Sequence, residues 1–248
     1  NLRDPRCIGD LNWAFFDGLA GLTVGIEAWG VADIFRIPKF SYHFFKSQQK
    51  TDKNKTLPFT TGAYITIANY WTEQPKDNKV IVYSNGDEVA LYLNDRLITR
   101  QKPDSGPETD YGTELHRGGK PFDGGNANRL AHPPFTFHNI RFAPGTLKAV
   151  AYQNGKELAS TSVSTPDKAA SIQLEIAEAG KPLTKGTDDL VFVYAAIKDA
   201  KGNPVSSASL PVSLKIMGDA EIIGTASIKA EAGIASFLIR IPKDSKKL

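Results

Sequence analysis

The first residues that could take part in binding or catalysis lie close together near the start of the chain. The apolar stretch IGDLNWAFFDG, residues 8–18, has the composition of a buried strand that runs into a glycine-containing loop. Trp13 lies within it, and an indole ring can serve as a stacking surface for the C–H face of a sugar. Asp17 lies at the exit from the strand, close behind Trp13. The alternative interpretation of Trp13 is an aromatic side chain of the hydrophobic core.

The carboxylates near this strand do not form a catalytic pair. Two carboxylates hydrolyse a glycosidic bond when they are held about 5 to 10 Å apart on either side of it. Glu27 and Asp33 flank the loop that follows, but no second strand end is present to hold a partner for Asp17. We therefore interpret Glu27 as a solvated loop acid or a cap, and we assign no catalytic residue within this chain.

Other catalytic and metal-binding patterns are absent from the sequence. It contains no G-x-S-x-G, P-loop, G-x-G-x-x-G or H-E-x-x-H motif. Its four histidines are scattered, and its single cysteine, Cys7, has no partner for an internal disulfide. We expect neither a metal site nor a cofactor.

Composition and charge exclude several classes of partner. The 248 residues are 41% hydrophobic and 23% charged, as in a globular chain that buries a core. The net charge of +3 is spread along the chain without a dense basic block, so we expect no nucleic-acid partner. No stretch approaches the roughly 18 apolar residues of a membrane span.

The predicted strand needs partners that residues 1–52 do not supply. A glycine-rich loop follows it, and then Pro38 opens a segment for which we predict a helix near 38–49. Three aromatic residues of this segment fall on one face at helical spacing: Phe40, Phe44 and Phe45. We expect His43 on the surface. Because one strand–helix unit cannot bury its own apolar faces, we expect the helix to pack on the next domain or on a second molecule.

From residue 53 onward the sequence changes to short runs with strand character. Turn signals such as SNGD, LNDR and QNGK separate them, and Asn154-Gly155 suits the positive φ angles of a type I′ hairpin. The linker STPDKAA divides the runs into two groups. We predict a mainly β fold with two immunoglobulin-like sandwiches in tandem, residues 53–166 and 167–248, after a strand–helix unit at 1–52.

Several stretches, taken in order, carry a family resemblance. NWAFFDG, residues 12–18, is similar to the end of the eighth barrel strand of glycoside hydrolase family 2, the β-galactosidase group. GVADIFRIPKFSYHFFKSQ, residues 30–48, resembles the family's G-V-x-D-x-F-R-x-P-K segment, which leads into the last barrel helix and is the most specific match. Later stretches, including VYSNGDEVALYLNDRLI and DAKGNPV, resemble the Ig-like domains that follow the barrel in many members.

The resemblance implies a role for each part of the chain. Residues 1–52 would be the last strand and helix of an incomplete TIM barrel, with Trp13 and Asp17 at its sugar-binding end. The family retains the anomeric configuration and uses two glutamates from earlier barrel strands, so both would lie upstream of this chain. The parent, periplasmic or secreted, would bind carbohydrate through its barrel and hydrolyse terminal β-glycosides. The chain alone would be inactive.

Two other functions stay open at this point. The sandwiches could form a carbohydrate-binding module with Tyr70 and Trp71 as an aromatic platform, although a tryptophan on such a strand is expected to pack in the core. The last domain resembles bacterial invasin repeats and could belong to an adhesin-like array, although only one copy is present. In the fragment, barrel-facing residues such as Phe15 and Phe16 would favour self-association.

Overall fold

The protein is mainly β and divides into two compact units, residues 1–164 and 165–248, next to the boundary predicted after residue 166. The computed structural model describes these residues: 14–19, 25–51, 60–73, 78–105, 130–177, 183 and 187–244. Among them, no helix is long and apolar enough to cross a membrane.

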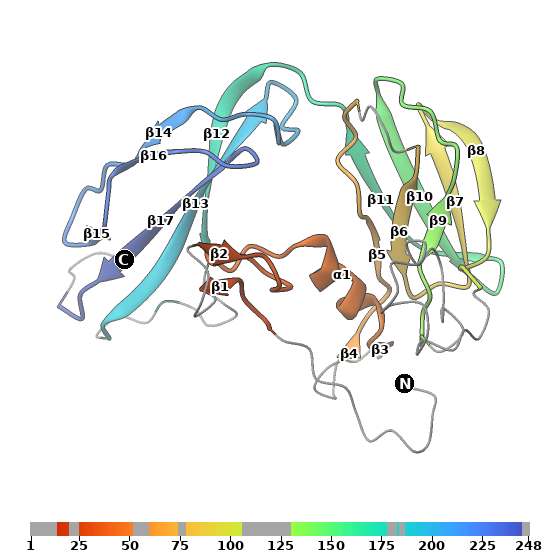
Figure 1. Ribbon diagram of the computed structural model, residues 1–248, viewed down its shortest axis with the longest axis horizontal. Helices are drawn as coiled ribbons and strands as arrows, with labels where there is room; N and C mark the ends of the chain where they lie inside the picture. Colours follow the sequence, from red (N-terminus) through yellow and green to blue (C-terminus); the bar gives the residue numbers. More distant parts are fainter. Residues whose placement is uncertain are drawn as a thin grey trace. The chain divides into compact units, whose positions relative to one another are not determined.

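The first unit contains a β-sandwich of two antiparallel sheets (Figure 1). The strands of the larger sheet are β7 (Glu88–Leu93), β8 (Arg96–Gln101), β10 (Thr146–Gln153) and β11 (Lys156–Ser164). The strands of the smaller sheet are β5 (Ile65–Ile67), β6 (Val80–Ser84) and β9 (Phe135–Phe137). The strand orders are β11-β10-β7-β8 and β5-β6-β9, so both sheets join strands that are distant in the sequence.

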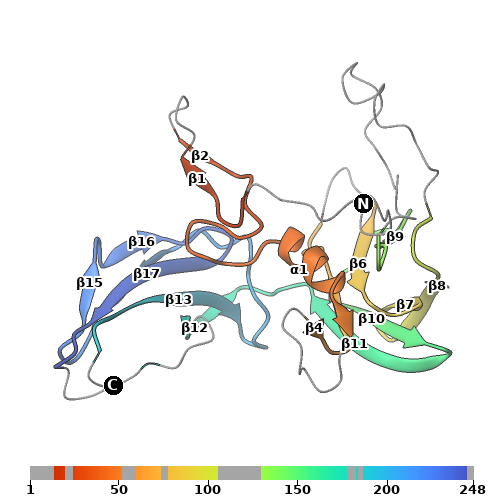
Figure 2. The ribbon, with the colours of Figure 1, turned by 90° about the horizontal axis from the view of Figure 1, so that it is seen from below.

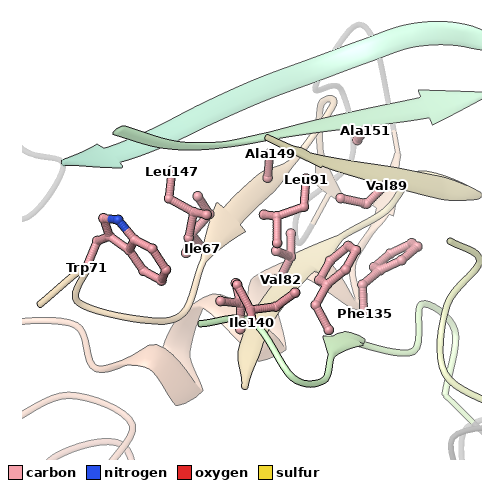
Figure 3. Packing of buried hydrophobic residues seen from close by; sticks show 12 residues of the cluster. Ile67, Trp71, Val82, Val89, Leu91, Phe135, Ile140, Leu147, Ala149 and Ala151 are labelled. Atoms are coloured by element: carbon pink, nitrogen blue, oxygen red, sulfur yellow. The ribbon is translucent and has the colours of Figure 1, made fainter. Parts of the chain in front are cut away.

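The core of this sandwich lies between the two sheets. Alternate residues of β6 are buried, as period-2 patterning requires for a strand with one core-facing side. Figure 3 shows side chains from both sheets meeting in one layer, with Leu91 and Leu147 from the larger sheet and Val82 and Phe135 from the smaller. This interdigitation is what holds the sandwich closed.

Two hairpins of the larger sheet turn where the sequence predicts. Asn154 and Gly155 have φ angles of 52° and 75° between β10 and β11. Asn94 and Asp95 have φ angles of 50° and 62° between β7 and β8. Both pairs therefore adopt the left-handed conformation that a type I′ turn needs, and the turn prediction is confirmed.

The second unit is also built from antiparallel strands around its own core. Its four-stranded sheet has the order β12-β13-β17-β15, and β14 pairs with β16. The bounds are β12 (Ala169–Ala177), β13 (Asp189–Asp199), β14 (Pro211–Ser213), β15 (Glu221–Ile223), β16 (Ser227–Lys229) and β17 (Ile234–Ile241). Val191, Phe237 and Val212 join the two sheets in one apolar cluster.

Asp199 ties the linker to the turn that follows β13. Its buried carboxylate accepts hydrogen bonds from the N–H of Asp167 at 3.0 Å and from those of Lys201 and Asn203, each at 2.8 Å. These donors, Asp167 first, hold the pKa of Asp199 well below its usual range. Gly202 supplies a φ of 85°, so the predicted DAKGNPV turn is confirmed.

The segment before the first sandwich departs in part from the prediction. The predicted loop contains an antiparallel hairpin, β1 (Gly18–Leu19) with β2 (Ile26–Glu27), and the helix α1 (Phe40–Ser47) follows it (Figure 2). The strands β3 (Lys50–Thr51) and β4 (Thr60–Thr61) then form a short parallel pair.

Pro38 does not open the helix, which begins two residues later than predicted. Pro38 forms an antiparallel bridge with Ala32, and the N–H of Lys39 donates to the carbonyl of Val31 at 3.0 Å. These tertiary contacts hold Pro38 and Lys39 in extended backbone, so α1 starts only at Phe40.

Candidate functional site

The structure describes only one of the two site residues predicted from the sequence. Trp13 lies outside the described residues. Asp17 lies at the end of the segment Ala14–Asp17, directly before β1. Glu27 lies on β2, opposite Gly18. Across the described ranges, no group of three or more His, Cys, Asp or Glu side chains is arranged to hold a metal ion.

The segment Ala14–Asp17 runs parallel to Val31–Ala32. The N–H of Ala32 donates to the carbonyl of Phe15 at 2.9 Å, and the N–H of Asp17 donates to the carbonyl of Ala32 at 3.0 Å. Phe16 and Ala32 form the parallel bridge between them. The end of the predicted strand therefore forms one parallel bridge, with a bend at Phe15, and its partner is the chain that leads into the helix.

Gly30 allows these two backbones to approach each other. A Cβ atom at this buried position would lie 2.3 Å from both the amide nitrogen of Asp17 and the carbonyl carbon of Phe16. The N–H of Gly30 also donates to Oδ1 of Asp17 at 2.8 Å. Only glycine fits at this point, because a side chain would push the two segments apart.

The carboxylate of Asp17 is paired with Lys39. Nζ of Lys39 lies 2.5 Å from Oδ1 of Asp17 and also donates to the carbonyl of Ala28 at 3.3 Å. The Asp17 side chain is 8% exposed and that of Lys39 is 30% exposed. Lys39 is the N-cap residue of α1, so this ion pair ties the end of the strand segment to the start of the helix.

Asp33 shapes the turn between Ala32 and the helix. Its Oδ1 accepts hydrogen bonds from the N–H of Phe35 at 2.9 Å and of Ile37 at 2.8 Å. Arg36 adopts a φ of 68°, and its guanidinium lies 5.8 Å from the centre of the Phe16 ring. The turn therefore folds back onto the strand segment.

The segment GVADIFRIPK thus holds residues 14–17 in place. Its glycine, aspartate, arginine and lysine share this structural role. We selected none of Gly30, Arg36 or Lys39 as a site residue from the sequence. The signal that could have found them was the motif itself, because its residue types are those of a close backbone approach, a turn and an ion pair.

Helix α1 packs on the first sandwich, which confirms the packing prediction. Two ring pairs join them, with centroids 5.3 and 5.6 Å apart: Phe40 with Tyr70 and Phe44 with Tyr83. The side chain of Gln48 donates to the carbonyl of His132 at 2.6 Å and accepts from its N–H at 3.0 Å. The helix therefore belongs to the same compact unit as the sandwich.

His43 lies in this interface, and the prediction of a surface position was wrong. Its Nδ1 lies 2.6 Å from the Tyr64 hydroxyl, and the two rings stack with centroids 6.4 Å apart. Burial, and then the charge of Lys46, lower the pKa of His43, while burial raises the pKa of Tyr64 to about 12. His43 is off the face of Phe40 and Phe44, but the sandwich covers that flank as well.

We expect acid to weaken the contact between α1 and the sandwich. The pKa of His43 is lower in the folded than in the unfolded chain, so the unfolded chain binds a proton first as the pH falls. The contribution of neutral His43 to the stability of the fold is therefore complete above about pH 6.5, and it is lost as the pH drops below that value. Thermal melts of the wild type and His43→Gln from pH 8 to pH 5 test this, because the variant should lose less stability. Identical pH dependence in both proteins would contradict it.

An open cavity of about 320 Å³ lies between the strand segment and α1. Most of its lining is apolar, from Ala14, Phe15, Val31, Tyr42 and Phe45, and Lys46 and Gln49 complete it. Phe15 and Phe45 are exposed there. The prediction of a common face was therefore wrong for Phe45, because consecutive helical residues point about 100° apart and Phe44 already faces the sandwich.

Tyr70 and Trp71 do not form one aromatic platform. Trp71 is 6% exposed, and its indole N–H donates to the carbonyl of Ala143 at 3.0 Å. Figure 3 shows it at one end of the core layer. Tyr70 is 53% exposed and contacts Phe40. The expectation of a core tryptophan is confirmed, and only Tyr70 of this pair reaches the surface.

Known proteins share both the sequence and the fold. Residues 76–159 match a family described as a domain of unknown function, DUF4982. The chain is 28% identical over 95% of its length to a β-galactosidase of Thermoanaerobacter pseudethanolicus, and 25% identical over 90% to one of Bacteroides ovatus. A solved β-glucuronidase from glycoside hydrolase family 2 superposes on 94% of the chain with a TM-score of 0.65 and 19% identity. The sequence and the fold of the chain are thus similar to those of glycoside hydrolase family 2 enzymes.

These similarities confirm the resemblance to glycoside hydrolase family 2 seen in the sequence. The sandwich-rich, mainly β fold matches that of the solved family 2 enzyme. The chain spans 30% and 23% of the two β-galactosidases and 23% of the solved β-glucuronidase. It therefore corresponds to less than a third of the length of each of these proteins.

Proposed function

We propose that the chain contributes the last strand–helix unit of a β-glycosidase barrel, together with two supporting sandwiches. The observation that carries this proposal is the likeness to a β-galactosidase over 95% of the chain, which includes the strand–helix unit and both sandwiches. The open cavity supports it further. Exposed phenylalanines beside a strand and a helix suit an element that packs against other barrel units.

In this proposal the chain supplies a wall of the sugar site and not the reacting groups. Trp13 stacks on the sugar from the end of the last strand, where barrel enzymes place their active sites. Two glutamates on earlier barrel strands protonate the leaving oxygen and capture the sugar covalently. The chain alone therefore hydrolyses no glycoside.

The substrate class that we propose is a terminal β-galactoside, because two relatives matched over most of the chain are named β-galactosidases. A β-glucuronide is the second candidate, since the solved family 2 relative is a β-glucuronidase. The two sugars differ in the configuration at C4 and in the charged carboxylate that glucuronic acid carries at C6, so a direct comparison of their aryl glycosides distinguishes them.

The proposal is tested by comparing two proteins on both aryl glycosides. We expect the purified 248-residue chain to give only background hydrolysis and the protein encoded by the whole reading frame to turn over the aryl β-galactoside. Changing either proposed glutamate to glutamine in the whole protein should abolish turnover. Hydrolysis by the 248-residue chain, or an inactive whole protein, would contradict the proposal. A preference for the β-glucuronide would change the proposed substrate from a β-galactoside to a β-glucuronide and would not contradict the proposed role of the chain.

A further inference from the structure

The ion pair of Asp17 and Lys39 closes a large excursion of the chain. Between these residues the backbone forms the β1–β2 hairpin and the Asp33 turn before it returns to Lys39. Nζ of Lys39 reaches both Asp17, at 2.5 Å, and the carbonyl of Ala28, at 3.3 Å. One ammonium group therefore holds the end of the strand segment and the returning chain together.

We propose that Lys39 is a positioning residue for the sugar site of the glycosidase, acting through Asp17. The proposal rests on the proposed function. It assigns Asp17 to the ion pair with Lys39, here called the lock, instead of to direct contact with the sugar. The Asp17 carboxylate is 8% exposed, and the same oxygen already accepts from Gly30 and Lys39. A lysine and an aspartate in this arrangement fix a backbone, while a sugar ligand would need a carboxylate open to solvent.

The lock holds the segment that follows Trp13, the residue proposed to stack on the sugar, in the sequence. Backbone hydrogen bonds hold Phe15 and Asp17 to Ala32, and the side chain of Asp17 adds the contacts to Gly30 and Lys39. Trp13 precedes this anchored segment in the chain. Releasing the anchor would let the strand end shift, and a shift of about 1 Å in a positioning group can cost roughly 100-fold in rate.

A substitution that removes only the charge of Lys39 tests the ion pair most directly. Lys39→Met keeps the length of the side chain but leaves the carboxylate of Asp17 without its counter-ion in a mostly buried place. Lys39→Arg keeps the charge and should restore most of the function. Lys201→Met is the matched control, because it removes an ion pair to Asp167 whose side chains are 74% and 66% exposed.

We expect Lys39→Met in the whole protein to lower kcat/KM for the preferred aryl glycoside about 10- to 100-fold, mainly through a higher KM. A displaced stacking wall weakens the binding of substrate and transition state alike, which raises KM. A merely structural defect would reduce the folded fraction, lowering kcat at an unchanged KM. Lys39→Arg should recover at least half of the loss on a logarithmic scale, and Lys201→Met should match the wild type.

Amide hydrogen exchange on the 248-residue chain separates this proposal from the proposed function. We expect Lys39→Met to accelerate exchange at Asp17 and Ala32 and to leave Ile140 of the sandwich unchanged. Unchanged exchange at Asp17 and Ala32 would overturn the lock, whatever the activity. Faster exchange with unchanged KM and kcat would overturn the positioning role. An inactive wild-type whole protein would reject the proposed function, while the exchange result would still decide whether the lock exists.

Discussion

Replacing Gly30 by alanine should detach the segment Ala14–Asp17 from Val31–Ala32. The added Cβ would lie 2.3 Å from two backbone atoms of the facing segment and 2.6 Å from the carbonyl oxygen of Ala32. Because these atoms belong to backbone, no flexible side chain can move aside. The segments must separate, which breaks their backbone hydrogen bonds and the one from Gly30 to Asp17. We expect the free energy that holds the segment to fall by about 3 kcal/mol or more.

Amide hydrogen exchange at Asp17 and Ala32 measures this release in the 248-residue chain. Gly18→Ala is the matched control, because a Cβ there would meet only the Trp29 ring at 3.8 Å, an ordinary contact. In the whole protein, Gly30→Ala should lower kcat/KM about 100-fold, and Gly18→Ala should have little effect. Wild-type exchange rates in Gly30→Ala would show that the two backbones are not in contact.

Truncation of Trp71 should destabilise the first sandwich by about 3–5 kcal/mol. Its indole fills one end of the core layer beside the Phe142 ring, with centroids 5.2 Å apart. Trp71→Ala leaves a cavity there and also removes the N–H that donates to the carbonyl of Ala143. Trp71→Phe keeps most of the apolar volume, so its cost should be clearly smaller. Urea unfolding of the three proteins gives these differences directly.

Tyr70→Ala is the control that separates packing from sugar binding. Tyr70 is exposed and contacts only the flank of Phe40 among the described rings, so we expect its loss to cost about 1 kcal/mol or less. Retention on a polysaccharide affinity gel that disappears in Tyr70→Ala, with stability intact, would favour the carbohydrate-binding alternative. A Trp71→Ala protein as stable as the wild type would contradict the core assignment.

The β-sandwiches could be predicted from the sequence because their signals are local. Alternation along β6 marks which residues face the core, and Asn-Gly or Asn-Asp pairs mark the hairpins, whose positive φ angles few other residues adopt. The DAKGNPV turn belongs to the same class. Its aspartate bonds to the backbone of residues that follow closely, so the residue types alone indicate the turn.

The surroundings of α1 could not be predicted in the same way. Helical spacing places Phe40 and Phe44 on one face and Phe45 about 100° away, but only the contacts with Tyr70 and Tyr83 show which face turns to the sandwich. His43 has no apolar signal, and its place follows from Tyr64, which lies 21 positions away in the chain. The β1–β2 hairpin escaped prediction because its strands are two residues each and glycines surround them.

By itself, the sequence determined the mainly β fold, its main turns, the core position of Trp71 and the resemblance to glycoside hydrolase family 2. Periodicity, turn residues and motifs are properties of neighbouring positions, so they can be recognised without knowledge of the fold. The tertiary structure alone decided the purpose of Gly30 and Lys39. Their partners, Phe16 and Asp17, lie across a long excursion of the chain, and such contacts form only when packing brings the two backbones together.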